Sequence, residues 1–218
     1  MKKTENGKLF VAAAFIAAFV LWTVLVRIVD VRAVGPEGTS VGFAGVNLAV
    51  HKFFGVNMAL YTVTDWLSLI PIGFAAGFGI LGSIQLIKRK HILRVDKSLI
   101  VLGVFYVLVM AVYLFFEFVV INYRPILIEG RLEASYPSST TMLVTCIMPT
   151  AIMQLNSRIK NRCIRYMSVA SVTAFTLFMV IARFMSGVHW ASDIIGGILI
   201  SVGLVSLYAW GKGLFEKK

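Results

Sequence analysis

Six long apolar segments constrain this chain more than any other feature of its sequence. The chain is 59% hydrophobic and only 14% charged, with a mean hydropathy of +0.87, whereas a soluble domain averages about 45–50% apolar and about 25% charged residues. A helix of about 20 apolar residues is long enough to cross a bilayer. The sequence therefore predicts an all-α, multi-pass membrane protein with six transmembrane helices. The segments cover approximately residues 9–29, 60–87, 98–121, 141–155, 167–185 and 193–211.

The basic residues gather on one side of these segments. Fifteen of the 21 Lys and Arg residues fall at the two termini and in the loops after the second and fourth segments. Because cytoplasmic loops carry the excess of Lys and Arg, both termini are predicted to be cytoplasmic and the membrane to be the cell (plasma) membrane. The net charge of +11 is then a topology signal, and we expect no nucleic-acid partner. The fifteen are Lys2, Lys3, Lys8, Lys88, Arg89, Lys90, Arg94, Lys97, Arg158, Lys160, Arg162, Arg165, Lys212, Lys217 and Lys218.

The chain contains no long polar stretch, so residues 1–218 are predicted to form a single membrane-embedded domain with a motif-bearing core at 98–211. The longest connection outside the segments should carry a short interfacial helix near Val46–Phe54. The second segment is overlong and contains Asp65 and Pro71, which predicts a kinked or tilted helix.

Two outer loops contain most of the residues that could carry chemistry. Residues 122–140 connect the third and fourth segments, and residues 186–192 connect the fifth and sixth. Six spans with cytoplasmic termini bring both loops to the same membrane face. Ionisable groups at such depth are rare in apolar chains and commonly functional. We therefore expect one site on the outer face.

His189 and Asp193 are the first candidates for that site. If the last helix begins near Val188, they are four residues apart on one helical face. A carboxylate bonded to one imidazole nitrogen fixes the tautomer, and the other nitrogen is then a nucleophile or a base. The alternative is a pair at the headgroup level that only caps the helix or reaches toward water.

Two arginines border the same loops. Arg124 precedes Pro125, which favours extended backbone and the end of the third helix there. Arg183 lies near the end of the fifth segment. Each arginine alone fits an interfacial anchor, but two guanidinium forks beside a His–Asp pair suit phosphate oxygens. Hydroxyls and first-turn amides of the run Ser138, Ser139 and Thr140, where the fourth helix should begin, would add to such an anion site.

These residues resemble the three motifs of the type-2 phosphatidic acid phosphatases, the membrane relatives of vanadium haloperoxidases. The family patterns are K-x6-R-P, P-S-G-H and S-R-x5-H-x3-D. This chain has Glu117-x6-Arg124-Pro125, Pro137-Ser138-Ser139-Thr140 and Ala182-Arg183-x5-His189-x3-Asp193. The resemblance implies a phosphohistidine at His189 oriented by Asp193, phosphate binding by Arg124 and Arg183, and no metal or other cofactor.

Two departures from the family pattern bear on activity. Glu117 stands where the family has lysine, and at about 6 Å with an effective dielectric near 20 one unit charge changes phosphate binding by roughly 3 kcal/mol. We expect Glu117 to pair with an arginine, to point away or to be protonated; Arg131 could replace the lost charge. Thr140 stands where the family has its general-acid histidine, a group that contributes about 10²–10⁴-fold.

The sequence thus predicts a membrane lipid phosphatase that acts on a lipid phosphate or, more readily, on a prenyl diphosphate, whose phosphate leaves without protonation. One alternative is an impaired relative that binds or translocates phospholipids, or a headgroup phosphotransferase. The other is an unrelated small-solute transporter, in which the His–Asp spacing is a coincidence. We expect the bilayer and a phospholipid or polyprenyl phosphate or diphosphate as partners; the sequence makes no prediction of oligomeric state.

Overall fold

The computed structural model of the protein describes residues 2–216, with side chains described for residues 6–215. Apart from one two-residue strand pair, its regular structure is helical, as the sequence predicts. The elements are α1 (Lys2–Ile28), β1 (Arg32–Ala33), η1 (Pro36–Gly38), β2 (Ser40–Val41), α2 (Ala44–Phe54), α3 (Met58–Leu67), α4 (Leu69–Arg89), η2 (Ile92–Arg94), α5 (Lys97–Phe118), α6 (Ser139–Arg158), α7 (Arg162–Met185) and α8 (Ala191–Glu216).

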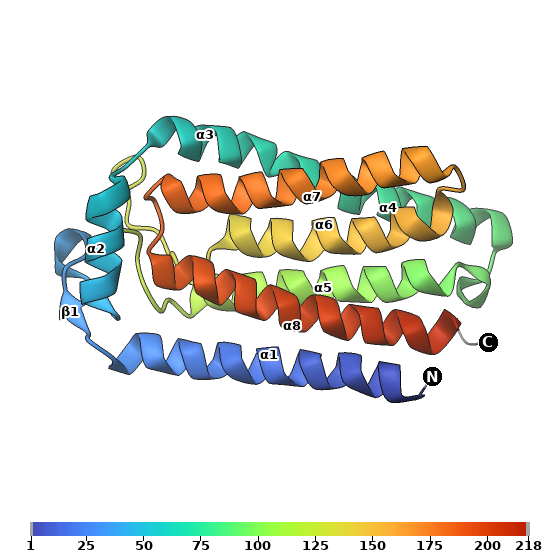
Figure 1. Cartoon of the computed structure of the whole chain (residues 1–218), viewed down its shortest axis with the longest axis horizontal. Coiled ribbons are helices and arrows are strands. Elements are labelled where there is room, and N and C mark those ends of the chain that lie inside the picture. The colour runs from blue at the N-terminus through green and yellow to red at the C-terminus, as the bar shows by residue number, and fades with distance from the viewer. Residues whose placement is uncertain (1, 217–218) are drawn as a thin grey trace.

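The long helices run side by side as one bundle (Figure 1). α2, the interfacial helix that the sequence predicts, lies across one end of the bundle, and both termini lie at the other end. The α4–α5 and α6–α7 connections, which carry the basic loops, share the end of the termini. We call this the basic end. The side chains of Lys2, Lys3, Lys217 and Lys218 lie outside the described residues.

Five helical segments in the described part of the chain are long and apolar enough to cross a membrane, which makes this a multi-pass membrane protein. They correspond to α1, α3 with α4, α5, α7 and α8. The sixth predicted span is α6, a 20-residue helix that carries several threonines and a glutamine. It lies in the middle of the bundle among the other helices (Figure 1), so its polar side chains are covered by protein rather than by lipid.

The overlong second segment is divided into two helices at Ser68. α3 ends at Leu67 and α4 begins at Leu69, and the Ser68 hydroxyl and amide both donate to the Asp65 carbonyl. Pro71 is the third residue of α4, where its missing N–H leaves no internal hydrogen bond unmade. The interruption of this segment therefore falls at Ser68 and not at Pro71.

The loop before α6 packs closely against the backbone of α8. Tyr136 is 1% exposed and stacks on Phe19 of α1 with ring centroids 6.1 Å apart. A Cβ added at Gly196 of α8 would lie only 2.6 Å from the Tyr136 ring, so glycine is required for this contact. Gly73 and Gly77 of α4, by contrast, have open space around them.

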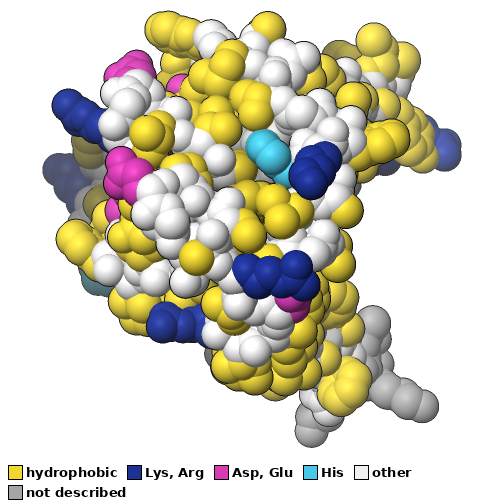
Figure 2. Space-filling model, turned by 90° about the vertical axis from the view of Figure 1, so that its left-hand side faces the viewer, with side chains coloured by type: hydrophobic (Ala, Val, Ile, Leu, Met, Phe, Trp, Pro, Cys, Tyr) yellow, Lys and Arg dark blue, Asp and Glu magenta, His cyan; other side chains and the backbone are white. Residues whose placement is uncertain are grey.

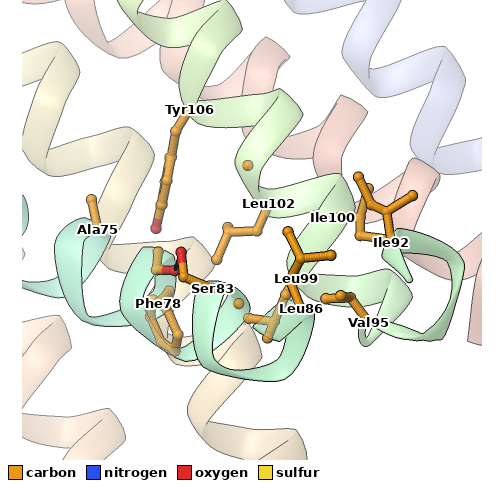
Figure 3. Close-up of a pocket in the computed structure, with 13 residues that line it drawn as sticks. Ala75, Phe78, Ser83, Leu86, Ile92, Val95, Leu99, Ile100, Leu102 and Tyr106 are labelled. Carbon is orange, nitrogen blue, oxygen red and sulfur yellow. Dashed lines mark hydrogen bonds between the residues drawn. The ribbon is translucent and has the colours of Figure 1, made fainter. Parts of the chain in front are cut away.

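A cavity of about 310 Å³ separates α4 from α5 toward the basic end (Figure 3). Its walls are apolar except for Ser83 and Tyr106, whose hydroxyl groups both face the cavity in Figure 3. None of the candidate residues in the outer loops lines it. The cavity is therefore separate from the site described below.

We expect Gly196→Ala to destabilise the protein by about 1–3 kcal/mol, because the added methyl group overlaps the Tyr136 ring in a packed interface. The matched control is Gly77→Ala, a helical position with nothing within 4 Å, where alanine should be neutral or stabilising. Thermal unfolding in detergent measures both. Equal melting temperatures for the two variants would show that the Tyr136–Gly196 contact contributes nothing.

Candidate functional site

Two loops meet at the end of the bundle opposite the basic end. The 119–138 connection between α5 and α6 and the 186–190 connection between α7 and α8 lie side by side there (Figure 1). A hydrogen bond from an indole joins the two loops, because Trp190 Nε1 donates to the Tyr123 carbonyl over 2.8 Å. Figure 2 shows this end, where histidine lies beside a basic side chain on a surface that is otherwise mostly uncharged. The predicted convergence of the two outer loops is therefore present.

Arg124 lies in the first of these loops. The sequence predicts that the third segment ends near residue 121, but α5 already ends at Phe118. Arg124 follows the bridge between Tyr123 and Ala134. Its amide donates to the Glu133 carbonyl over 3.1 Å, and its Nε lies 3.0 Å from the Glu133 carboxylate. The extended backbone expected before Pro125 is thus held by pairing with the opposite side of the loop.

Arg183 lies in the last turn of α7 and is 1% exposed. Its guanidinium donates to Thr140 Oγ1 over 2.8 Å and to Thr64 Oγ1 over 3.1 Å. The Asp65 carboxylate is 3.7 Å away. A buried arginine requires such partners, and here α3 and α6 supply them.

The ring of Tyr61 joins the two arginines. The guanidinium carbon of Arg183 lies 4.8 Å from the ring centroid and that of Arg124 lies 5.9 Å from it. Both distances are within the range of a cation–π contact. The two positive groups therefore converge on one aromatic ring, although 59 positions separate them in the sequence.

His189 precedes α8 rather than lying within it. α8 begins at Ala191, so the helical i, i+4 spacing assumed from the sequence is wrong, and the histidine projects from the connection between the helices. Gly187 shapes that connection: its φ is +67°, and a Cβ there would lie 1.9 Å from the Gly55 carbonyl oxygen. His189 is nevertheless 4.0 Å from the carboxylate of Asp193.

A serine bridges the histidine and the aspartate. Ser135 Oγ lies 2.5 Å from Asp193 Oδ2 and 2.9 Å from His189 Nδ1. Because a carboxylate only accepts, the hydroxyl proton is used toward Asp193, and Nδ1–H of His189 must donate to Oγ. The lone pair of the ring is then on Nε2, which lies 3.4 Å from Arg124 Nη1.

Asp193 is fully buried and accepts from four donors. Besides Ser135, these are the Trp190 amide at 3.0 Å, Asn122 Nδ2 at 3.1 Å and Ser192 Oγ at 3.3 Å. Asp193 is the third residue of α8, so its bond back to Trp190 also caps that helix. The sequence gave a helix cap as the alternative to a catalytic role for this residue. That cap is present, together with the contact to His189 through Ser135.

Three causes lower the pKa of His189 well below its usual value. Burial is the largest, followed by the positive charges of Arg124 and Arg183, while a hydrogen bond with the Ser135 backbone raises the pKa and opposes them. The imidazole therefore stays neutral at pH 7, and its neutral form persists as the pH falls through 6.5. A neutral Nε2 is the form in which histidine acts as a nucleophile.

The run at the start of α6 lies beside the arginines. Ser138 is the N-cap of α6 and accepts from the Thr141 amide, and Thr140 bonds to Arg183. Glu117 is exposed and lines a cavity of about 20 Å³, large enough for one water, with Ser135 and Ser139. Among residues 6–215, no ion pair joins Glu117 to an arginine. Of the three expectations for Glu117, pointing away from the arginines fits this arrangement.

Arg131 is the residue that the sequence offers as a replacement for the lost lysine charge. It is exposed in the turn where its backbone pairs with Ile128. Glu133, from the same loop, is the residue that contacts Arg124. This part of the site therefore gains a negative charge, not the positive one expected to replace the family lysine.

The family model of the PAP2 superfamily matches residues 86–214, a range that contains all three motifs. The chain belongs to the PAP2 superfamily. Its structure is similar to the crystal structure of the first transmembrane PAP2 type phosphatidylglycerolphosphate phosphatase from Bacillus subtilis. The TM-score is 0.60 with 19% identity, covering 95% of this chain and 97% of that one, so the likeness shows a common fold. No curated protein matches the sequence.

This PAP2 protein has site neighbours that sequence reasoning missed. Tyr61, Thr64 and Asp65 are spaced three and four residues apart on α3, so they lie on one helical face, and that pattern could have marked them. Ser135 stands two residues before Pro137 in a loop with several other polar residues, so nothing in the sequence singles it out. Glu133 and Asn122 lie in the same loop.

In this PAP2 protein the two arginine charges should help to lower the pKa of His189. Arg124→Gln removes the nearer one and should raise that pKa, because protonation no longer places two cations together. Arg131→Gln, an exposed cation of the same loop, is the control and should leave it unchanged. NMR titration of histidine-labelled protein in detergent, with the His189 signal assigned by His189→Ala, measures the shift. A wild-type pKa near 6.5 would contradict the prediction.

Proposed function

We propose that this protein is an integral membrane phosphatase that removes phosphate from a lipid phosphate or prenyl diphosphate through a phosphohistidine on His189. The observation that carries the proposal is the orientation of that ring. Nδ1–H is committed to Ser135, so the lone pair of Nε2 faces Arg124, 3.4 Å from its guanidinium. A nucleophile is thereby placed where a phosphate bound to the arginine would lie.

The reaction then has two steps. Nε2 of His189 attacks phosphorus, the bond from phosphorus to the leaving oxygen breaks, and a phosphohistidine forms. Positive charge develops on the ring, and the Ser135–Asp193 pair stabilises it through the Nδ1–H bond. Water next attacks phosphorus, the P–N bond breaks, and free phosphate leaves with His189 neutral again.

The arginines would neutralise the phosphate without a metal. In the substrate-free protein each has a carboxylate neighbour, Glu133 for Arg124 and Asp65 for Arg183. Both carboxylates are partly exposed and can turn toward water when the anion binds. The first-turn amides of α6, which lack helical partners, would supply further donors near Thr140.

The leaving oxygen limits the substrate class. Thr140 stands where the superfamily has its general-acid histidine, and its hydroxyl accepts a bond from Arg183. A hydroxyl is a poor proton donor, so an alkoxide would have to leave unprotonated from a phosphomonoester. When a prenyl diphosphate is attacked at its terminal phosphorus, the leaving group is instead the prenyl monophosphate, which is stable as an anion. We therefore favour a prenyl diphosphate as substrate.

The rival function is a catalytically impaired PAP2 protein that binds or translocates phospholipids, or that transfers headgroups. The threonine at position 140 and the carboxylates beside both arginines favour it. Such a protein would keep the anion site and bind lipid phosphates without releasing phosphate. A headgroup transferase would instead transfer the phosphate group to an added alcohol acceptor, without forming free phosphate.

We also propose the orientation in the membrane. The basic end, where the structure places the described loops with Lys and Arg, would face the cytoplasm by the positive-inside rule. The candidate site would then open at the outer face of the plasma membrane, near the headgroups of the outer leaflet. The lipid phosphate would reach it from that leaflet.

Phosphate release tests the activity and the substrate class together. The detergent-purified protein should release phosphate from a long-chain prenyl diphosphate at least about 10²-fold faster than from phosphatidic acid or phosphatidylglycerol phosphate, the lower end of a general acid's contribution. His189→Ala should reduce release to background because the nucleophile is gone. Thr140→His should selectively raise the monoester rate.

Three other results would change the proposal. Faster turnover of monoesters than of the diphosphate would exclude the leaving-group argument. Phosphate release that survives His189→Ala would exclude the phosphohistidine. Lipid binding without turnover of any substrate would favour the binding or translocating protein.

Ser135 should act as a positioning residue for His189. Ser135→Ala breaks the bridge to Asp193 and should lower kcat about 10- to 100-fold with little change in KM, as expected for a bond of about 1.5–3 kcal/mol to a charged group. Ser135→Thr keeps the hydroxyl and should restore much of the rate. Nitrogen NMR of His189 should also show that the tautomer protonated at Nδ1 predominates in the wild type and in Ser135→Thr, but not in Ser135→Ala. An unchanged tautomer would show that the bridge does not orient the ring.

A further inference from the structure

A buried asparagine of α2 holds the first turn of α8 beside the candidate site. Asn47 is 1% exposed. Its Oδ1 accepts from the Ser192 amide over 3.1 Å, and its Nδ2 donates to Ser192 Oγ over 3.0 Å and to the Gly42 carbonyl over 2.8 Å. Ser192 immediately precedes Asp193. The hydrogen bonds of the site therefore continue beyond Asp193 onto a helix that contains none of the three motifs.

Backbone groups fix the direction in which the Asn47 amide faces. The backbone N–H of Ser192 can only donate, so it requires the carbonyl oxygen of the asparagine. The Gly42 carbonyl can only accept, so it requires the NH2 group. With both requirements met, the NH2 group also faces Ser192 Oγ. This last bond therefore has one direction, from the asparagine to the serine.

The hydroxyl of Ser192 continues this direction toward Asp193. Because Oγ accepts from Asn47, its single proton is available to the carboxylate, which only accepts. Ser192 Oγ lies 3.3 Å from Asp193 Oδ1. The carbonyl of Ser192 separately accepts from Trp22 Nε1 over 3.0 Å. The serine is thus held by α1 and α2 together while its proton points at Asp193.

The two oxygens of the Asp193 carboxylate face different partners. Oδ1 accepts from Ser192 Oγ and Asn122 Nδ2. Oδ2 accepts from Ser135 Oγ and the Trp190 amide. The terminal torsion of an aspartate has broad energy wells, so its donors decide the plane of the carboxylate. A donor fixed at Oδ1 therefore keeps Oδ2 turned toward the serine that bonds to the histidine ring.

α2 is itself held near both of its ends. In its first turn, the Gly45 amide donates to Asp30 Oδ2 over 2.7 Å. Near its last turn, the ring of His51 lies against Trp190, with ring centroids 5.5 Å apart. Asn47 therefore projects from a supported helix, and little side-chain freedom remains to be lost when it orients its partner.

We infer that Asn47 is a positioning residue for the His189–Asp193 pair. By directing the Ser192 hydroxyl at Oδ1, it keeps Oδ2 toward Ser135 and so favours the imidazole proton on Nδ1. The inference rests on the proposed function, because this tautomer is the one that presents Nε2 to a phosphate. The tautomer is nevertheless a property of the protein alone, and it can be measured without any substrate.

Nitrogen NMR of the full chain in detergent, with labelled histidine, measures the tautomer of His189. Asn47→Ala should reduce the fraction protonated at Nδ1. With a prenyl diphosphate as substrate it should also lower kcat about 3- to 10-fold and leave KM unchanged, because the lost bond orients the ring and does not touch the substrate. The matched control is Asn161→Ala, which removes an asparagine cap from α7 at the basic end. It should leave the tautomer and kcat unchanged.

A double variant separates positioning from support of the fold. Ser192→Ala removes the hydroxyl but keeps the amide bond to Asn47. If Asn47 acts through that hydroxyl, adding Asn47→Ala to Ser192→Ala should shift the tautomer no further. Melting temperatures identify a variant that fails to fold. Asn47→Ser then replaces Asn47→Ala, since its hydroxyl can bond within α2 but is too short to reach Ser192.

Two results would overturn the inference. An unchanged His189 tautomer in a folded Asn47 variant would mean that the asparagine only caps α8. Additive tautomer shifts in the double variant would mean that Asn47 acts on the ring by a route other than Ser192. Absence of turnover in the wild type would instead contradict the phosphatase proposal, and the tautomer comparison would still decide the role of Asn47.

Discussion

The buried carboxylate of Asp193 makes the hydrogen bonds on which the end of the bundle opposite the basic end depends. A charge without solvent must be met by donors, and those that meet it come from the 122–135 loop, from Trp190 and from Ser192. Satisfying this one group therefore holds the α5–α6 loop against the start of α8. The same bonds orient Ser135 toward His189, so the requirement for a stable buried charge and the requirement for a fixed tautomer are met together.

The arginines place a second constraint on the same region. Two guanidinium groups contact the ring of Tyr61, and their mutual repulsion would be unfavourable in a poorly solvated site without Glu133 and Asp65 nearby. The substrate-free site is therefore close to electrostatic balance, with the cations fixed more firmly than the exposed carboxylates. An arriving phosphate can take over the role of those carboxylates, which is how an anion site can remain stable while empty. The threonine at position 140 belongs to this balance as a partner of Arg183.

The sequence predicted the helices well because their cause is local. Long apolar runs must form helices in a bilayer to satisfy their own backbone groups, and α1, α5, α7 and α8 follow the predicted segments closely. α6 was also predicted, although its threonines and Gln154 make it too polar to recognise by hydropathy alone. Errors arose where backbone geometry is decided by distant contacts: α5 ends at Phe118, and His189 lies before α8 rather than on it. The match to the PAP2 superfamily confirms the family resemblance that the sequence predicted.

By itself, the sequence determined the order of the apolar helical segments, the concentration of basic loops at one end, and the convergence of Arg124, Arg183, His189 and Asp193. These follow from hydropathy, charge and motif spacing, which each act within a short stretch of chain or count residues along it. Only the tertiary structure decided that Ser135 stands between His189 and Asp193, that Tyr61 joins the arginines, and that Glu117 lies apart from them. Those relations depend on how loops far apart in sequence satisfy buried polar groups, and no local pattern encodes which partner a buried group will find.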